Sequence, residues 1–374
     1  MKRLPSSRSP LTWVVVAAIL SLLLGSIVPP LYINHSRPLP VDQDFSVESA
    51  PATGPVLDVD AYSQRAVPEA NRAEEGCGAD SSKLRCYITE SDITVTRKMR
   101  SQSTDFPGAE KKSVAATSSD VSFQVSGRTL LETSEEAFLN RESAYPMPGE
   151  NNSQHVGGAL FASGFEQDAF ERDGLNYFFP SATEQRSYAY FDSLTQRAEP
   201  IDYRTKETLE TIPTYVYHQD VAPTSLPEAL DGAGPATLRG PARDFYSPDS
   251  LARYNLGAAD SVVLEPYYTV SREVWVEPTT GTVLNADEKL SIFYATDAKQ
   301  AKDMAAAQDT AQRSLLSVDM TFSDDSRAQR HSTVAPLITT IKVLSLLGWA
   351  GKALGMVLLG VAAFIFVRRH RARG

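Results

Sequence analysis

Four closely spaced carboxylates are the residues of this chain whose type and spacing come nearest to a catalytic set: Glu132, Glu135, Glu136 and Glu142. A pair of carboxyl groups flanking a glycosidic bond can hydrolyse it, one as acid and the other as base or nucleophile. A solvated acidic face accounts for the same residues. The sequence holds no nucleophile elbow, no paired metal-binding histidines and no phosphate-cradling glycine loop. We therefore expect no enzymatic activity and no cofactor, and a cryptic envelope glycan hydrolase is kept as an alternative.

The second chemically capable pair is Cys77 and Cys86, the only cysteines of the chain. In an oxidising compartment two cysteines at this spacing form a disulfide. Closing so short a loop stabilises a fold by about 2 to 3 kcal/mol in the chain-entropy model. Half of a metal site is the other interpretation, but the histidines are scattered singly without ligand spacing. We expect a disulfide and no metal.

Aromatic side chains are concentrated between Asn176 and Val221, with one further tryptophan downstream. The candidate residues are Tyr177, Phe178, Phe179, Tyr188, Tyr190, Phe191, Tyr215, Tyr217 and Trp275. Such rings commonly fill the core of a sheet. They could equally line an apolar ligand cavity for a lipid chain. Both interpretations stay open at the level of sequence.

The elements that would position these residues are mostly strands. Val121, Phe123 and Val125 alternate with polar residues, which is typical of a strand with one buried face. A turn at 277–281 joins two alternating runs and predicts a hairpin. The region 295–318 is rich in helix formers and predicts a C-terminal helix. We expect an extended lead-in over 34–75 and an antiparallel, barrel-like β-rich (α+β) extracytoplasmic domain over 76–333.

Two apolar runs bracket this domain. The first, 11–33, predicts an uncleaved signal anchor whose apolar part ends at Pro29 and Pro30, and a cleaved signal peptide is the alternative. The second, 343–367, is long enough to cross a bilayer and is preceded at 334–347 by a possible interfacial helix. The expected membrane anchors are Trp13, Trp349, Lys352, Arg368 and Arg369.

The charge of the flanks predicts the topology. Residues 1–10 and 368–374 are basic and contain no acid, so both termini should be cytoplasmic, in the plasma membrane, with the central domain outside. The whole chain nevertheless has a net charge of -10, which makes the central part strongly acidic. An acidic domain is a poor electrostatic match for nucleic acid. We expect membrane lipid as a partner and no nucleic acid.

The order of several motifs resembles the actinobacterial porin PorA-type family, which has been catalogued as a domain of unknown function. The motifs are 173–180 (DGLNYFFP), 183–192 (TEQRSYAYFD), 94–100 (TVTRKMR), 275–281 (WVEPTTG) and 321–325 (TFSDD). The resemblance covers nearly the whole chain. It implies a two-span cell-envelope protein with an external β-rich domain, and some members are associated with maturation of the lipoglycans lipomannan and lipoarabinomannan.

Our leading functional hypothesis at this point is a non-enzymatic, membrane-anchored envelope protein. Its external domain would bind or transfer a lipid or lipoglycan, or would scaffold the enzymes that build that lipoglycan. The alternative is a porin-like channel or transporter subunit, supported by the family name and by the small residues Gly348, Gly351, Gly355 and Gly360, which allow close helix packing in the second span.

Overall fold

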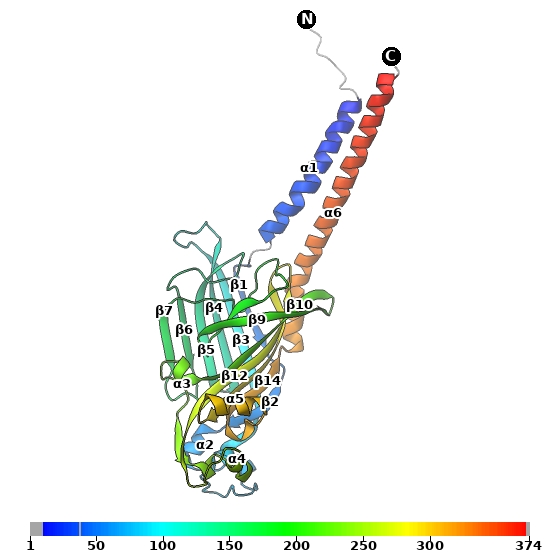
Figure 1. Ribbon diagram of the computed structural model, residues 1–374. Helices are drawn as coiled ribbons and strands as arrows, with labels where there is room; N and C mark the ends of the chain where they lie inside the picture. The colour runs from blue at the N-terminus through cyan, green and yellow to red at the C-terminus, as the bar shows by residue number, and fades with distance from the viewer. Residues whose placement is uncertain (1–9, 37–38, 372–374) are drawn as a thin grey trace. The chain divides into compact units, whose positions relative to one another are not determined.

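The computed structural model describes residues 10–36 and 39–371, and the chain divides into two compact units (Figure 1). One unit is helical and comprises the two ends of the chain. The other, Leu39–His331, is built around a sheet. Each unit is described separately below.

The sheet unit contains fourteen strands in one antiparallel sheet. The first seven are β1 (Gln43–Glu48), β2 (Ala52–Leu57), β3 (Ile88–Thr104), β4 (Val114–Val125), β5 (Arg128–Asn140), β6 (Asn152–Gly157) and β7 (Phe165–Phe170). The others are β8 (Tyr188–Asp192), β9 (Arg197–Leu209), β10 (Ile212–Ser225), β11 (Leu238–Pro241), β12 (Ser261–Glu277), β13 (Thr282–Ala295) and β14 (Ser314–Thr321). The strand order is β7-β6-β5-β4-β3-β2-β14-β13-β12-β10-β9-β8, with β1 beside β3 and β11 beside β12.

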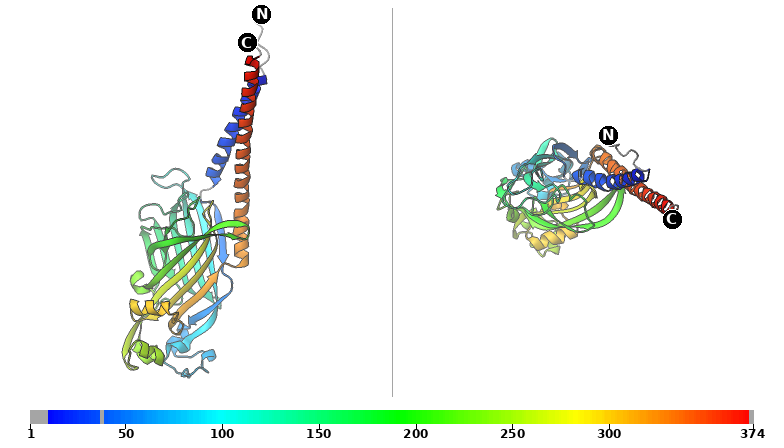
Figure 2. Two further views of the ribbon diagram at one scale, coloured as in Figure 1. Left: turned by 45° about the vertical axis from the view of Figure 1, so that its right-hand side comes forward. Right: turned by 90° about the horizontal axis from the view of Figure 1, so that it is seen from above.

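The sheet curls around an interior but stays open (Figure 2). Its two edge strands, β7 and β8, follow one another in the chain and are joined by the segment 171–187. The antiparallel, barrel-like fold class expected from the sequence is confirmed. The hairpin expected around 277–281 is also present, as β12 and β13.

The two faces of the sheet differ sharply in polarity. On β4, Val121 and Phe123 are buried, whereas the alternating Ser122 and Gln124 are half-buried. Exposed charged side chains occupy the outer face on several strands: Lys98, Arg100, Glu132, Glu136, Asp202, Arg204, Glu273, Lys289 and Asp319. A sheet that faces lipid carries an apolar outer band instead. The outer surface of this sheet is therefore suited to water.

The helices and helical turns of this unit are short. They are α2 (Val59–Gln64), α3 (Leu226–Ala229), α4 (Pro248–Arg253), α5 (Ala298–Ala306), η1 (Glu69–Asn71), η2 (Leu84–Tyr87), η3 (Ala242–Asp244) and η4 (Ala311–Arg313). The disulfide between Cys77 and Cys86 is confirmed, and both cysteines are completely buried in the apolar core. It ties the connection between α2 and β3 to the end of the sheet.

Two expectations about this unit are wrong in their extent. The helix expected over 295–318 is only α5, and the rest of that region forms η4 and β14. Leu316, Val318 and Met320 alternate with more exposed residues, so the strand pattern overrides helix propensity there. The lead-in expected to be extended over 34–75 instead holds the end of α1 (Pro10–Ser36), β1, β2, α2 and η1, and its two strands pair with β3.

The helical unit is formed by α1 and by α6 (Asp324–Arg371), whose first eight residues belong to the sheet unit. Both helices are long and apolar enough to cross a membrane. The first helix, expected over 11–33, continues through Pro29 and Pro30 and ends at Ser36. Residues 334–347, expected as a possible interfacial helix, lie within the continuous α6, and their location at the membrane surface stays a prediction.

Small residues mediate the contact between α1 and α6 within the helical unit. The hydroxyl of Ser21 donates a hydrogen bond of 2.8 Å to the carbonyl of Gly351. A Cβ added at Gly25 would lie 2.8 Å from the carbonyl oxygen of Gly348, and one at Gly355 would lie 2.5 Å from Leu22. Glycine therefore permits a close approach of the two backbones.

Candidate functional site: a plugged interior with buried charges

The segment between the two edge strands enters the interior of the sheet. We call residues 171–180 the plug. Leu175 forms a parallel bridge with Tyr190, and Phe178 forms an antiparallel bridge with Thr282. Leu175, Phe178 and Phe179 are buried in one of the apolar clusters of the unit. The plug is therefore packed into the fold rather than lying on its surface.

The backbone of the plug adopts positive φ angles at two positions. Gly174 has a φ of 84° and Tyr177 a φ of 64°. Such an angle is ordinary for glycine and uncommon for a bulky residue. Non-glycine residues with a positive φ angle persist only where the surrounding structure fixes them, and they cluster at functional sites. Tyr177 therefore identifies the plug as a segment whose conformation is imposed by its contacts.

The hairpin turn between β12 and β13 fits closely against the plug. The backbone N–H of Phe179 donates a 3.0 Å hydrogen bond to the carbonyl of Gly281. Gly281 has a φ of 73°, and a Cβ built there would lie 2.0 Å from the carbonyl oxygen of Phe179. Only glycine permits this approach without movement of one backbone.

Glu135 on β5 holds the plug from the other side. Its carboxylate accepts hydrogen bonds from Arg172 at 3.0 Å and from Asn176 at 2.9 Å, and a longer one of 3.4 Å from the hydroxyl of Tyr177. The hydroxyl of Ser193 also donates to Glu135. Arg172 and Glu135 are both deeply buried, so this is a charge pair removed from water. Three of the four donors come from the plug.

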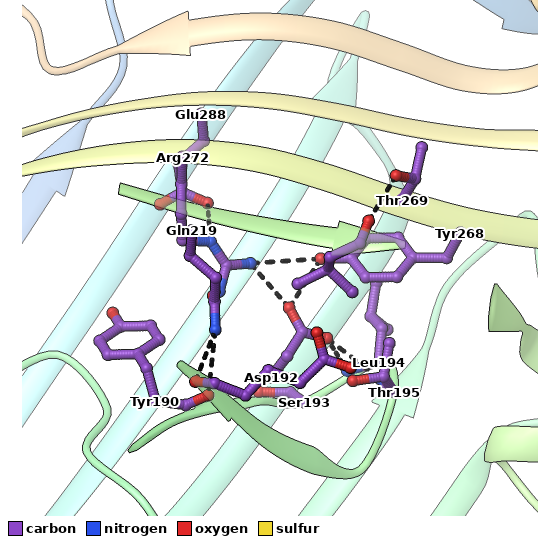
Figure 3. Close-up of polar contacts among 12 residues, drawn as sticks. Tyr190, Asp192, Ser193, Leu194, Thr195, Gln219, Tyr268, Thr269, Arg272 and Glu288 are labelled. Carbon is purple, nitrogen blue, oxygen red and sulfur yellow. Dashed lines mark hydrogen bonds and ion pairs between the residues drawn. The ribbon is translucent and has the colours of Figure 1, made fainter. Parts of the chain in front are cut away.

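A second charged group lies around Arg272 on β12 (Figure 3). Its guanidinium donates at 2.7 Å to Asp192 and at 2.9 Å to the side-chain oxygen of Gln219. The hydroxyl of Tyr268 donates to the same carboxylate at 2.9 Å. Burial acts to lower the pKa of Arg272, but Asp192, Tyr268 and Glu288 together outweigh burial, and the pKa lies well above its usual value. The guanidinium of Arg272 is therefore a permanent cation inside the sheet.

Arg97 on β3 connects the two groups. It lies 3.3 Å from the carboxylate of Glu288 on β13, and its guanidinium stacks over the ring of Tyr177 with 4.9 Å to the ring centre. Glu288 also lies 3.9 Å from Arg272. Burial acts to lower the pKa of Arg97, but Glu288 together with Tyr177 and Tyr190 outweighs burial, and the pKa is raised. The plug and the strands thus share one network of buried charges.

A cavity of about 60 Å³ lies within this network. Its lining includes Arg97, Arg272, Glu288, Tyr177 and Tyr190. Burial raises the pKa of Tyr177 and of Tyr190 above the usual value for a phenol, so both hydroxyls stay protonated at neutral pH. Two smaller cavities, of about 20 and 30 Å³, also border Arg97 and Glu288.

The aromatic residues singled out in the sequence are distributed over four places. Tyr177, Tyr190 and Phe191 line the main cavity. Phe178, Phe179, Tyr188 and Tyr217 are buried in the adjacent core, where Phe179 lies 4.8 Å from Tyr217 between ring centres. Tyr215 is half-buried beside Tyr203. Trp275 lies on the outer face and donates a 2.9 Å hydrogen bond to Glu207. A lipid cavity lined by these rings stays a prediction.

The other predicted residues lie on separate surfaces. Glu132 and Glu136 are on the outer face of β5, Glu135 points inward, and Glu142 is exposed beyond the strand. In the helical unit, Trp13 and Trp349 are largely exposed, Lys352 is half-buried, and Arg368 and Arg369 are exposed near the end of α6. Their role as membrane anchors stays a prediction.

Sequence reasoning missed the buried charges. A signal was nevertheless present for four of them, because these charges occupy inward positions of alternating strands. Arg97 lies between Val95 and Met99, and Arg272 lies between Val270 and Val274. Glu135 and Glu288 show the same pattern on β5 and β13. A charged residue in phase with apolar neighbours predicts a buried ion pair or a functional group.

Comparison with known proteins agrees with the motif order. A sequence model of the family described as Porin PorA matches residues 11–364. A protein of Corynebacterium resistens named Porin PorA is 25% identical over 94% of this chain and 95% of its own length. A second protein named Porin PorA, from Corynebacterium amycolatum, is 25% identical over 78% of this chain and 79% of its own length. The chain therefore belongs to the PorA porin family.

Proposed function

We propose that the protein is a non-enzymatic envelope membrane protein that serves as a subunit of a channel or transporter. The single observation that carries the proposal is the distribution of apolar surface. The outer face of the sheet is charged, whereas α1 and α6 expose large apolar side chains such as Leu24, Leu346 and Phe364. The helices, and not the strands, would face lipid. The relatives named Porin PorA support the transport role.

Two helices from one copy cannot enclose an aqueous path. A helical pore in this proposal is therefore formed by α1 and α6 of several copies. The glycines at the contact let α1 and α6 of each copy pack closely as a pair, because small residues let helices approach in a bilayer. The sheet unit would serve as an external domain.

The proposed topology places both termini in the cytoplasm and the sheet unit outside. Basic residues in both terminal flanks support it, since such loops remain on the cytoplasmic side. The buried disulfide between Cys77 and Cys86 gives independent support, because disulfides form and persist in oxidising compartments. A membrane-impermeant maleimide should label Glu110→Cys in intact cells and should leave Arg373→Cys unlabelled. Labelling at Arg373→Cys would contradict this topology.

Recording from the purified full-length protein in planar bilayers tests the channel function. We expect stepwise conductance that is abolished or strongly altered by Gly351→Leu, because this side chain would push α1 away from α6. Gly360→Leu is the matched control, since a Cβ there meets nothing within 4 Å. An unaltered variant conductance would contradict a helical pore, and absence of any conductance would contradict the channel function itself.

A further inference from the structure

We propose that the cavity of about 60 Å³ lined by Arg97 and Arg272 is a binding site for one small anion, of the size of a halide or formate. This site is a property of the sheet unit and does not depend on whether the protein conducts. Three observations support the proposal. The acceptor positions of the Asp192 carboxylate are all used, guanidinium N–H groups have no hydrogen-bond partner within the described part of the chain, and the cavity is small.

The carboxylate of Asp192 has no accepting capacity to spare. One oxygen accepts from the backbone N–H groups of Leu194 and Thr195, both at 3.0 Å. The other accepts from the hydroxyl of Tyr268 at 2.9 Å and from Arg272 at 2.7 Å. Four good donors therefore satisfy its lone pairs. Asp192 cannot satisfy further donors that face the cavity.

Guanidinium donors remain unsatisfied at the same place. Within residues 10–36 and 39–371, the buried Nε atoms of Arg97 and Arg272 have no hydrogen-bond partner. The side chain of Arg272 is only 8% exposed, so bulk water does not reach it freely. A carboxylate oxygen of Glu288 lies 3.9 Å from Nε of Arg272, which is too long for a hydrogen bond. The cavity wall therefore has a surplus of cationic donors.

The volume of the cavity decides the size of the ligand. About 60 Å³ is available. This is several times the roughly 10 to 15 Å³ that one water molecule needs, so the space has room for a halide or formate. Charge-assisted hydrogen bonds from guanidinium groups to an anion are stronger than those to a neutral acceptor. Size and donor chemistry together point to a small anion.

Bromide is the first probe, since it can be located by anomalous diffraction in crystals of the full-length protein. We expect a bromide peak between Arg97 and Arg272. We also expect the thermal unfolding temperature to rise with bromide or formate, at constant ionic strength, relative to a large anion such as gluconate. A cavity that holds only water in bromide-soaked crystals would overturn the proposal.

Two substitutions give opposite expectations, so a general loss of folding cannot imitate the result. Arg97→Gln removes one cation and should weaken bromide binding by about tenfold or more. Glu288→Gln removes the competing negative charge and should strengthen binding several-fold. Arg100→Gln is the control, because Arg100 is on the same strand but its side chain is 56% exposed on the outer face. Changes of the same sign at Arg97 and Glu288 would overturn the proposal.

Discussion

Arg172 in the plug and Glu135 on β5 form an ion pair of 3.0 Å in which each side chain is only 3% exposed. The pair links the plug to β5. The plug is part of the connection between the two edge strands, and β5 lies inside one half of the sheet. Removing one member leaves the other charge buried. Such truncations cost far more free energy than the intact pair contributes.

Arg172→Met should lower the free energy of unfolding by about 3 to 5 kcal/mol, because Glu135 would lose its charged partner. Chemical denaturation measures this change. Arg253→Met is the control, since its ion pair with Asp309 has a 57% exposed arginine and should contribute within about 1 kcal/mol. Equal effects of the two substitutions would show that the buried pair does not hold the plug.

Gly281→Ala tests the fit between the hairpin turn and the plug. Its Cβ would lie 2.0 Å from the carbonyl oxygen of Phe179, so we expect destabilisation by about 3 kcal/mol or more. Gly108→Ala is a close control, because Gly108 has a φ of 79° and open space around its Cβ position. The control should lose only about 1 to 2 kcal/mol from the backbone angle. Thermal unfolding compares the two variants.

Replacing both Cys77 and Cys86 by serine should reduce the free energy of unfolding by about 2 to 3 kcal/mol, from the loss of a short covalent loop. Both positions are fully buried, so the new hydroxyls add a desolvation cost. Reducing the disulfide of the wild-type protein separates the two contributions. A wild-type protein as stable after reduction as before would contradict a stabilising role for the disulfide.

The buried tyrosines predict a particular alkaline titration. Burial raises the pKa of Tyr177, Tyr190, Tyr217 and Tyr268 above the usual value. Their contribution to stability is fully present below the unfolded-state pKa of about 10 and is lost as pH rises through the raised folded-state values.

Phenolate absorbance near 295 nm should therefore appear in two steps: accessible tyrosines first, and the buried ones only as the sheet unit unfolds. Circular dichroism recorded in parallel identifies the unfolding step. A single step that is complete while the fold persists would contradict the burial of these phenols.

Local patterns predicted much of the fold. Alternation in Val121, Phe123 and Val125 predicted strands, and the turn at 277–281 predicted the hairpin of β12 and β13. The helix expected at 295–318 was too long, because Leu316 and Val318 pair with β13 and that pairing depends on the distant strand. The apolar run ends at Pro29 and Pro30, but α1 continues to Ser36, a few residues beyond the span expected over 11–33.

The candidate site was harder to predict, because its charges meet only after long-range pairing. Arg97 and Glu288 are far apart in sequence but converge across the interior. The DGLNYFFP motif at 173–180 was singled out for its order in the chain, and its aromatic residues were assigned to a core or cavity. Nothing local in that motif shows that Arg172 and Asn176 would meet Glu135.

The plug also affects how the protein avoids self-association. An unpaired edge strand can template the addition of strands from another molecule. Leu175 bonds through its backbone to Ala189 and Phe191, and so occupies the free edge of β8. The opposite edge, β7, carries Glu166 and Asp168, with a positive φ at Ala169 that interrupts regular pairing. Loss of the plug would thus expose an aggregation-prone edge, making solubility depend on the same residues that fill the interior.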